Sequence, residues 1–167
     1  MRALKHNNLA SWCAVVSGAF ALAGCSLPLQ PGVSGEADVV AYFGKPEETR
    51  KLADGGTEYD YPRGPLGRET WRVHLNNAGK VAQVEQLLEP NHFNQIQRGM
   101  TREQVHRVLG RQAITSRYKN LNEEVWSWRY IEMNDMYFFF NAHFDAATGQ
   151  LKYASRTIEI ERYRRRR

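Results

Sequence analysis

The chain has 167 residues, of which 42% are apolar and 25% charged, a composition that excludes wholesale disorder and allows one ordinary domain or two small ones. Its formal net charge of +5 would suit a nucleic-acid-binding protein. Seven of its basic residues, however, lie near the two ends of the chain: Arg2, Lys5, Arg162, Arg164, Arg165, Arg166 and Arg167. The residues between these ends hold 16 basic and 18 acidic side chains, a net charge of −2, which argues against nucleic acid as a partner.

The first 25 residues have the pattern of an export signal. A short basic segment precedes an apolar run over residues 9–21, which is too short to span a membrane. The run ends in Leu22-Ala23-Gly24-Cys25, which resembles the lipobox of bacterial lipoproteins. Small residues there fit a peptidase cleft, and the Cys25 thiol is the nucleophile that receives a diacylglycerol. We therefore predict a signal peptide over residues 1–24 and a membrane anchor of acyl chains on Cys25; the alternative is an ordinary signal peptide with an incidental cysteine.

Ser26 follows the predicted lipid-bearing residue. In lipoproteins of this kind a residue other than Asp at this position is associated with release to the outer membrane. The resemblance thus implies a periplasm-facing protein anchored in a bacterial outer membrane. Cys13 would be removed with the signal, leaving one acylated cysteine, so neither a disulfide nor a cysteine-based metal site is expected. A segment containing proline and glycine completes a predicted lipidated tether over residues 25–33.

The rest of the sequence contains two similar halves. Gly32 and Gly44 in the first half correspond to Gly99 and Gly110 in the second, at offsets of 67 and 66 residues. A repeat with a period of about 66–70 residues indicates two copies of one small structural unit. The predicted units cover residues 34–90 and 91–161.

The clearest helix is predicted over residues 102–109. Thr101 and Gln104 fit the S/T-x-x-E/Q capping box at its start, and Gly110 is a typical helix stop. Its apolar stripe consists of Val105, Val108 and Leu109. The first unit repeats this helix over residues 34–43, and a further short helix is predicted over residues 91–97.

Segments of alternating apolar residues follow the helices in each unit and predict three strands per unit. They lie at 58–61, 71–75 and 81–85 in the first unit and at 126–130, 136–144 and 151–160 in the second. Short polar turns between them predict antiparallel pairing. The expected fold class is α+β, with two tandem units that each pack one or two short helices on a three- to four-stranded antiparallel sheet.

One set of residues in the second unit matches the pattern of a known family. It comprises Phe93, Ile96, Gly99-Met100-Thr101, Val105, Leu109-Gly110, Trp126, Trp128, Phe144-Asp145 and Gly149. This pattern resembles the SmpA/OmlA (BamE-like) domain of outer-membrane lipoproteins, and the two-copy arrangement is similar to the β-lactamase inhibitory protein fold. The resemblance covers about 70 residues and is weaker in the first unit. It implies a role in outer-membrane assembly. The chain departs from the family in having two units, and in having Gln112 where the first unit has Pro46.

We find no sequence pattern typical of a catalytic or metal site. The histidines beyond the signal, namely His74, His92, His106 and His143, lack metal-ligand spacing. His74 and His143 occupy equivalent positions in the two units, which favours a shared structural role. Two acidic pairs, Glu47-Glu48 and Glu123-Glu124, are expected to be solvated turn residues. We expect no catalytic residues, no cofactor and no metal, and a chain that is not an enzyme.

The segment Met136–Phe140 is apolar on both faces of its predicted strand. Tyr137 and Phe139 point to one side, and Phe138 and Phe140 to the other. One pair is expected to pack beneath the helices. The other pair would either pack between the units or bind a partner, so all four aromatic residues are candidates for a partner surface.

The C-terminal run over residues 162–167 contains Arg162, Arg164, Arg165, Arg166 and Arg167. It is either a solvated end or a contact to an anionic surface such as phospholipid or lipopolysaccharide. Taken together, the patterns predict an outer-membrane lipoprotein that binds an envelope protein complex and acts in outer-membrane assembly or envelope integrity. The alternative is an inhibitor or sensor that docks a periplasmic enzyme through its sheet surface.

Overall fold

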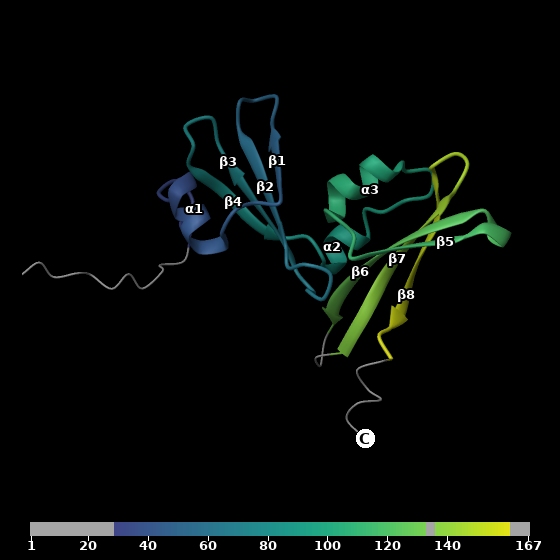
Figure 1. The fold of residues 1–167 in the computed structure, drawn as a ribbon. Helices are drawn as coiled ribbons and strands as arrows, with labels where there is room; N and C mark the ends of the chain where they lie inside the picture. Colours follow the sequence, from purple (N-terminus) through teal and green to yellow (C-terminus); the bar gives the residue numbers. More distant parts are fainter. Residues whose placement is uncertain (1–28, 133–135, 161–167) are drawn as a thin grey trace, which may run out of the picture.

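The computed structural model of the chain describes residues 29–132 and 136–160. It contains two antiparallel four-stranded sheets with a few short helices, arranged as two tandem units (Figure 1), which confirms the predicted fold class. Among these residues, no helix has the length and apolar character that crossing a membrane requires. Cys25 and the arginine run over 162–167 lie outside the described residues.

The first unit packs a single helix on one face of its sheet. Its elements are α1 (Glu36–Phe43), β1 (Glu48–Lys51), β2 (Thr57–Pro62), β3 (Thr70–Leu75) and β4 (Val81–Gln86), with the strands in the order β1-β2-β3-β4. Val39 of α1 is fully buried against Val73 and Leu75 of β3 and the tyrosines of β2. Phe43 stacks on Tyr61 with ring centroids 4.8 Å apart. Burial of these aromatic and aliphatic side chains drives the unit to fold.

The second unit has a larger, more aromatic core. Its elements are α2 (Pro90–Phe93), α3 (Arg102–Leu109), β5 (Ile114–Tyr118), a 3₁₀ turn (Lys119–Leu121), β6 (Glu123–Glu132), β7 (Met136–Asp145) and β8 (Leu151–Ile158), with the strands in the order β5-β6-β7-β8. Val105 and Leu109 of α3 pack against Trp128 and Tyr130 of β6. Phe93 of α2 stacks on Phe140 with ring centroids 4.4 Å apart. Both helices therefore cover the same face of this sheet.

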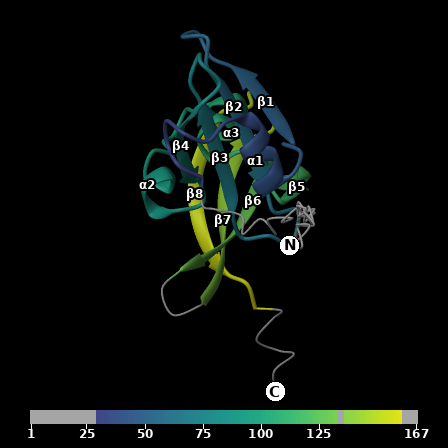
Figure 2. The same ribbon diagram turned by 90° about the vertical axis from the view of Figure 1, so that its left-hand side faces the viewer.

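The two units are stacked in four layers. From left to right in Figure 1 these are α1, the first sheet, α2 with α3, and the second sheet. In the perpendicular view of Figure 2 the sheets overlap, with α1 in front of the first sheet. The helices of the second unit thus lie between the two sheets, with their apolar side on the second sheet and their other side toward the first.

Equivalent backbone contacts confirm that the two halves are copies of one unit. Gly32 donates its N–H to the carbonyl of Val81, and Gly99 donates to Leu151, each at 2.8 Å. Gly44 and Gly110 follow the main helices with φ of 87° and 68°, a conformation that favours glycine. These similar positive φ angles explain why the glycines mark the repeat in the sequence.

The predicted main helices are close to those observed. Each sheet has four strands, within the predicted three to four, but the sequence pattern located only three of them in each unit. The helix over 102–109 has the predicted bounds, with Thr101 and Gln104 forming both bonds of the capping box. The helix predicted over 34–43 begins at Glu36, and the one predicted over 91–97 spans only Pro90–Phe93. Each sheet has a further strand at its edge, β1 in the first and β5 in the second. The sequence did not predict these two strands, because they carry polar residues with no apolar alternation.

Candidate functional site

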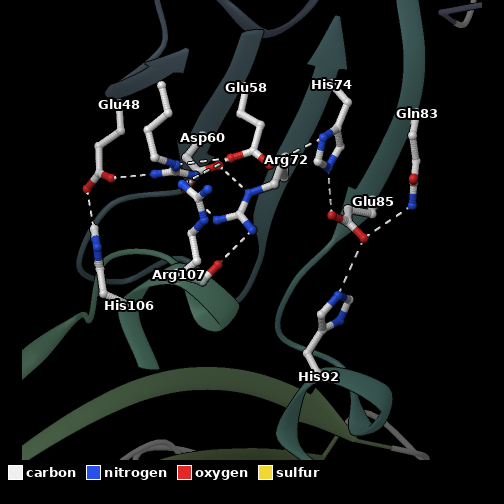
Figure 3. Close-up of polar contacts among 11 residues, drawn as sticks. Glu48, Glu58, Asp60, Arg72, His74, Gln83, Glu85, His92, His106 and Arg107 are labelled. Carbon is white, nitrogen blue, oxygen red and sulfur yellow. Dashed lines mark hydrogen bonds and ion pairs between the residues drawn. The ribbon is translucent and has the colours of Figure 1, made fainter. Parts of the chain in front are cut away.

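The face of the first sheet opposite α1 is lined by charged side chains. Because side chains alternate along a strand, the pattern that buries Tyr59, Tyr61 and Val73 against α1 points their neighbours the other way. We call this surface the charged face; it consists of Glu48, Arg50, Glu58, Asp60, Arg72, His74, Gln83 and Glu85. It is the side of the sheet that meets the second unit (Figure 3).

A buried ion pair lies at the centre of the charged face. Asp60 is 1% exposed, and its carboxylate accepts hydrogen bonds from Nε and Nη2 of Arg72 at 2.7 and 2.9 Å. Arg50 donates a third bond to the same carboxylate at 2.7 Å and a fourth to Glu58 at 3.1 Å. Burial alone would raise the pKa of Asp60, but the bonds and charges of Arg72 and Arg50 outweigh it and hold that pKa below its usual value.

The charged face binds the second unit through α3. Arg72 donates from Nη1 to the backbone carbonyl of Arg107 at 2.8 Å. That carbonyl belongs to the last turn of α3, where the unpaired carbonyls of a helix favour a cation. On the same helix, His106 contacts Glu48 at 3.0 Å (Figure 3). The end of α3 is thus held by groups from two strands of the first sheet.

A second contact lies at the other end of the charged face. Glu85 of β4 joins His74 of β3 at 3.0 Å and His92 of α2 at 3.4 Å. His74 also lies 3.3 Å from Glu58. Three histidines therefore pair with carboxylates on this face, and two of them, His92 and His106, come from the second unit. These pairs explain why the face is charged: it is the seam that joins the units.

The second sheet has an equivalent face, which none of the described helices covers. We call it the outer face; the positions that correspond to the charged face are Ile114, Ser116, Val125, Ser127, Asn141, His143, Tyr153 and Ser155. The described helices lie elsewhere, with α1 on the first sheet and with α2 and α3 on the opposite face of this sheet (Figure 1). The surface that accepts a neighbouring unit in the first half therefore faces away from the described helices in the second half, although its residues Val125, Ser127 and Asn141 are themselves buried.

The chemistry of the outer face differs from that of the charged face. At the positions of Asp60 and Arg72, hydroxyl and amide groups replace the buried ion pair: Ser127 donates to Asn141 at 2.7 Å, and Asn141 donates to Thr157 at 3.0 Å. His143 keeps an ion pair, with Glu123 at 3.4 Å. Tyr153, which is 46% exposed, stacks on the His143 ring with centroids 4.1 Å apart. The three serines of the outer face, with its one tyrosine and one asparagine, are residue types that are also enriched in the protein-binding loops of antibodies.

The four aromatic residues predicted as a partner surface divide between the two faces of β7. Phe140 is buried, and Phe138 packs against the core beneath the helices. Tyr137 and Phe139 lie on the same side of the sheet as the outer face but beyond it, where guanidinium groups cover them. Arg68, which covers Tyr137 at 4.2 Å from its ring centroid, comes from the β2–β3 loop of the first unit. The predicted contact between units therefore exists at Tyr137.

The acidic pairs expected to be solvated take part in ion pairs instead. Glu123 and Glu124 belong to β6 and are 6% and 7% exposed. Glu123 accepts a bond from Lys152 at 2.6 Å, which lowers its pKa despite its burial. The expectation was wrong for Glu123 and Glu124, because neighbouring charges, brought close only by the fold, compensate their burial; Glu47 is exposed in the bend before β1, as expected. Within residues 29–132 and 136–160, no group of three or more His, Cys, Asp and Glu side chains could hold a metal ion.

Comparisons with known proteins identify no family for this chain. No family model matches its sequence, and neither does any curated protein. Two solved structures are similar in fold. One is a proposed β-lactamase inhibitor protein from Streptococcus mutans (TM-score 0.28, 10% identity, 74% of this chain and 82% of that chain). The other is a DUF4309 family protein from Bacillus subtilis (TM-score 0.29, 12% identity, 78% of this chain and 82% of that chain). The resemblance to the SmpA/OmlA domain is not confirmed, and TM-scores this low assign no function.

Proposed function

We propose that this chain is a lipoprotein, anchored through Cys25 in a bacterial outer membrane and facing the periplasm, that binds another envelope protein. In this role it acts as a scaffold in outer-membrane assembly or envelope integrity. Catalysis has no part in the proposal. The binding surface is the outer face of the second sheet, on which Tyr153 is an exposed aromatic side chain.

One observation carries this proposal: the outer face repeats a surface that already binds protein within the same chain. In the first unit the equivalent positions bind the helices of the second unit. Arg72, which is buried, and Glu48, which is half-buried, bind α3, and the half-buried Glu85 binds α2. In the second unit they face away from every described helix (Figure 1). Because repeat proteins bury the faces of their units against neighbours, a terminal unit with such a face open is suited to an external partner.

Photo-cross-linking from the outer face tests the proposal. A photoreactive amino acid at position 153 is expected to capture one defined envelope protein in intact cells, identified by mass spectrometry. Tyr42 provides a matched control, because it is 48% exposed but lies on α1. Truncating an interface tyrosine commonly weakens binding, so Tyr153→Ala should reduce recovery of the captured protein about tenfold, and Tyr42→Ala should not. Equal capture from both positions would contradict the assignment of the outer face.

The identity of the captured protein separates the two candidate roles. A β-barrel assembly component would support the scaffold, whereas a stoichiometric periplasmic hydrolase would support the inhibitor or sensor. The neutral hydroxyl and amide groups of the outer face suit either partner, since they bind by shape and hydrogen bonding rather than by net charge.

The lipid anchor makes a separate prediction. In cells supplied with an alkyne-tagged fatty acid, the unchanged protein is expected to carry the label, and Cys25→Ser should lose it completely. Cys13→Ser is the matched control, because Cys13 lies in the segment that would be cleaved off, and it should leave labelling of the mature protein unchanged. The Cys25 variant should also associate with outer-membrane fractions less than the unchanged protein does. Labelling that persists in that variant would exclude the lipoprotein assignment.

A further inference from the structure

Exposed aliphatic side chains gather at one end of the molecule. Of the eleven large hydrophobic residues that are exposed in the described part of the chain, five lie there: Leu66, Ile131, Met136, Ile158 and Ile160. We call this region the aliphatic end; its members are between 41% and 74% exposed. Strand pairing places four of them at this end of the second sheet, on both of its faces. Ile131 is paired with Tyr137 on one face, and Ile158 is paired with Phe138 on the opposite face, which also carries Met136; Ile160 follows two residues after Ile158. In both views the end of β8 and the start of β7 lie at the same end of the molecule (Figures 1 and 2).

The β2–β3 loop of the first unit brings Leu66 to this end. Arg68 binds Glu159 at 2.7 Å and covers the Tyr137 ring, and the Pro65 carbonyl accepts a bond from Arg129. These bonds fix the loop, so Leu66 is held outward at 74% exposure rather than folded into a core. A hollow of about 470 Å³ beside it is lined by Leu66, Ile131 and Tyr137 among others. Holding so many aliphatic groups in water is unfavourable unless something covers them.

The aliphatic end is rimmed by arginines. Its described charged residues are Arg63, Arg68, Arg129, Arg156, Glu69, Glu132 and Glu159. Three of the four arginines are paired with two of these carboxylates, Arg68 and Arg129 with Glu159 and Arg156 with Glu132, so the four arginines and three carboxylates sum to a net charge of only +1. The sequence adds five arginines between positions 162 and 167, directly after Ile160. Exposed aliphatic side chains with arginines beside them match a membrane surface. The aliphatic side chains can enter the membrane interface, and the arginines can meet anionic headgroups.

The start of the described chain lies beside the same loop. Leu29 lines a hollow of about 350 Å³ together with Arg63 and Glu69, and these two residues also line the hollow beside Leu66. Four peptide steps separate Leu29 from Cys25, a contour of about 14 Å at most. A lipid attached to Cys25 would therefore lie within about 14 Å of Leu29.

We propose that the aliphatic end is a second membrane contact, which inserts Leu66 and Ile131 into the interface of an anionic phospholipid bilayer. The inference that this end lies down on the anchoring membrane rests on the proposed function, because it uses the anchor at Cys25. Its consequence is a fixed orientation. The aliphatic end faces the lipid, and Tyr153, which is 46% exposed and lies farther along the sheet, remains accessible to a protein partner.

Binding to vesicles tests this contact without the anchor. Every contact described above lies within residues 29–160, so a chain of residues 26–167 keeps all of them while lacking Cys25 and the predicted signal. It is expected to co-sediment with vesicles of equal parts phosphatidylglycerol and phosphatidylcholine, and not with phosphatidylcholine alone. The double variant Leu66→Ser with Ile131→Ser should weaken the partition coefficient about tenfold, because two aliphatic side chains no longer leave water.

Leu121 offers a matched control for Leu66. It is 61% exposed in the 3₁₀ turn before β6, away from the aliphatic end, and Leu121→Ser should leave vesicle binding unchanged. Three results would overturn the inference: no binding to the anionic vesicles, equal binding by the double variant and the control, or binding to lipopolysaccharide aggregates only. Removal of residues 162–167 should weaken binding without abolishing the effect of the serine substitutions. If tail removal alone abolishes binding and the substitutions do nothing, the arginine tail is the contact and the inference is wrong.

The experiment separates this inference from the proposed anchor. The tested chain cannot be acylated, so vesicle binding that depends on Leu66 and Ile131 stands even if fatty-acid labelling of Cys25 fails. Conversely, a labelled protein whose unacylated form ignores the vesicles keeps its anchor and loses the second contact.

Discussion

Asp60→Asn is expected to lower the free energy of unfolding by about 3–5 kcal/mol at neutral pH, the range measured when one partner of a buried ion pair is removed. Asparagine has nearly the same shape, so packing around β2 is preserved. The cost arises because Arg72 and Arg50 keep their charges on a face where Asp60 is 1% exposed. Arg72 also binds the last turn of α3, so the loss weakens the seam between the units as well as the first sheet.

Glu132→Gln is the control for this substitution. Its carboxylate lies 3.5 Å from Arg156, and both side chains are at least one-third exposed. Exposed pairs of this kind contribute less than about 1 kcal/mol, so the variant should unfold close to the unchanged protein in urea. Unfolding midpoints that fall equally for the two variants would show that the buried pair contributes no more than a surface pair.

The same carboxylate should make stability depend on acid. The pKa of Asp60 is lower in the folded chain than in the unfolded chain, so its contribution is complete above the unfolded value of about 4. It is lost as the pH falls through the lower folded pKa, because protonation then becomes easier for the unfolded chain. Several other carboxylates, Glu159 among them, also have lowered pKa values. The part due to Asp60 is therefore the difference between the unchanged protein and Asp60→Asn, which should shrink as the pH falls below about 4.

Local sequence signals were sufficient for those parts of the fold that depend on neighbours along the chain. The bounds of α3 follow from Thr101, Gln104 and Gly110, which act within one or two helical turns. The repeat was visible because positive φ angles at Gly44 and Gly110 require the same residue twice. The strands β1 and β5 gave no such signal, since polar edge strands are stabilised by a paired neighbour rather than by their own alternation.

The charged seam could not be predicted from the sequence, because its contacts join residues far apart in the chain. His106 and Glu48 are separated by 58 positions, and Arg72 and Arg107 by 35. Each of these residues is of a type that is usually exposed to solvent. Only the stacking of α3 on the first sheet brings them into contact. The aromatic run of β7 was predicted in part. Its alternation correctly separated Tyr137 and Phe139 from Phe138 and Phe140, but only the position of the helices shows which of the two pairs packs in the core.

Gly110→Ala is expected to cost more stability than Gly44→Ala, although the two glycines are equivalent in the repeat. Both have positive φ with ψ near −160°, so alanine is strained by about 1–3 kcal/mol at either position. At Gly44 the new Cβ would meet nothing within 4 Å. At Gly110 it would lie 3.0 Å from Cγ2 of Thr70, which belongs to β3 of the other unit. The excess cost at Gly110, measured by urea unfolding, therefore reports how tightly the seam is packed.

A double-mutant cycle assigns this excess to one contact. Thr70→Ser removes Cγ2 but keeps the hydroxyl, so it should restore room for the alanine at position 110. The cycle of Gly110→Ala and Thr70→Ser is then expected to show a favourable coupling of about 1 kcal/mol, whereas Gly44→Ala and Thr70→Ser should be additive because they share no contact. If Gly110→Ala costs no more than Gly44→Ala, the units move apart by the few tenths of an ångström needed. The interface between the units would then be held mainly by its ion pairs and would be able to shift, rather than being rigid and close-packed.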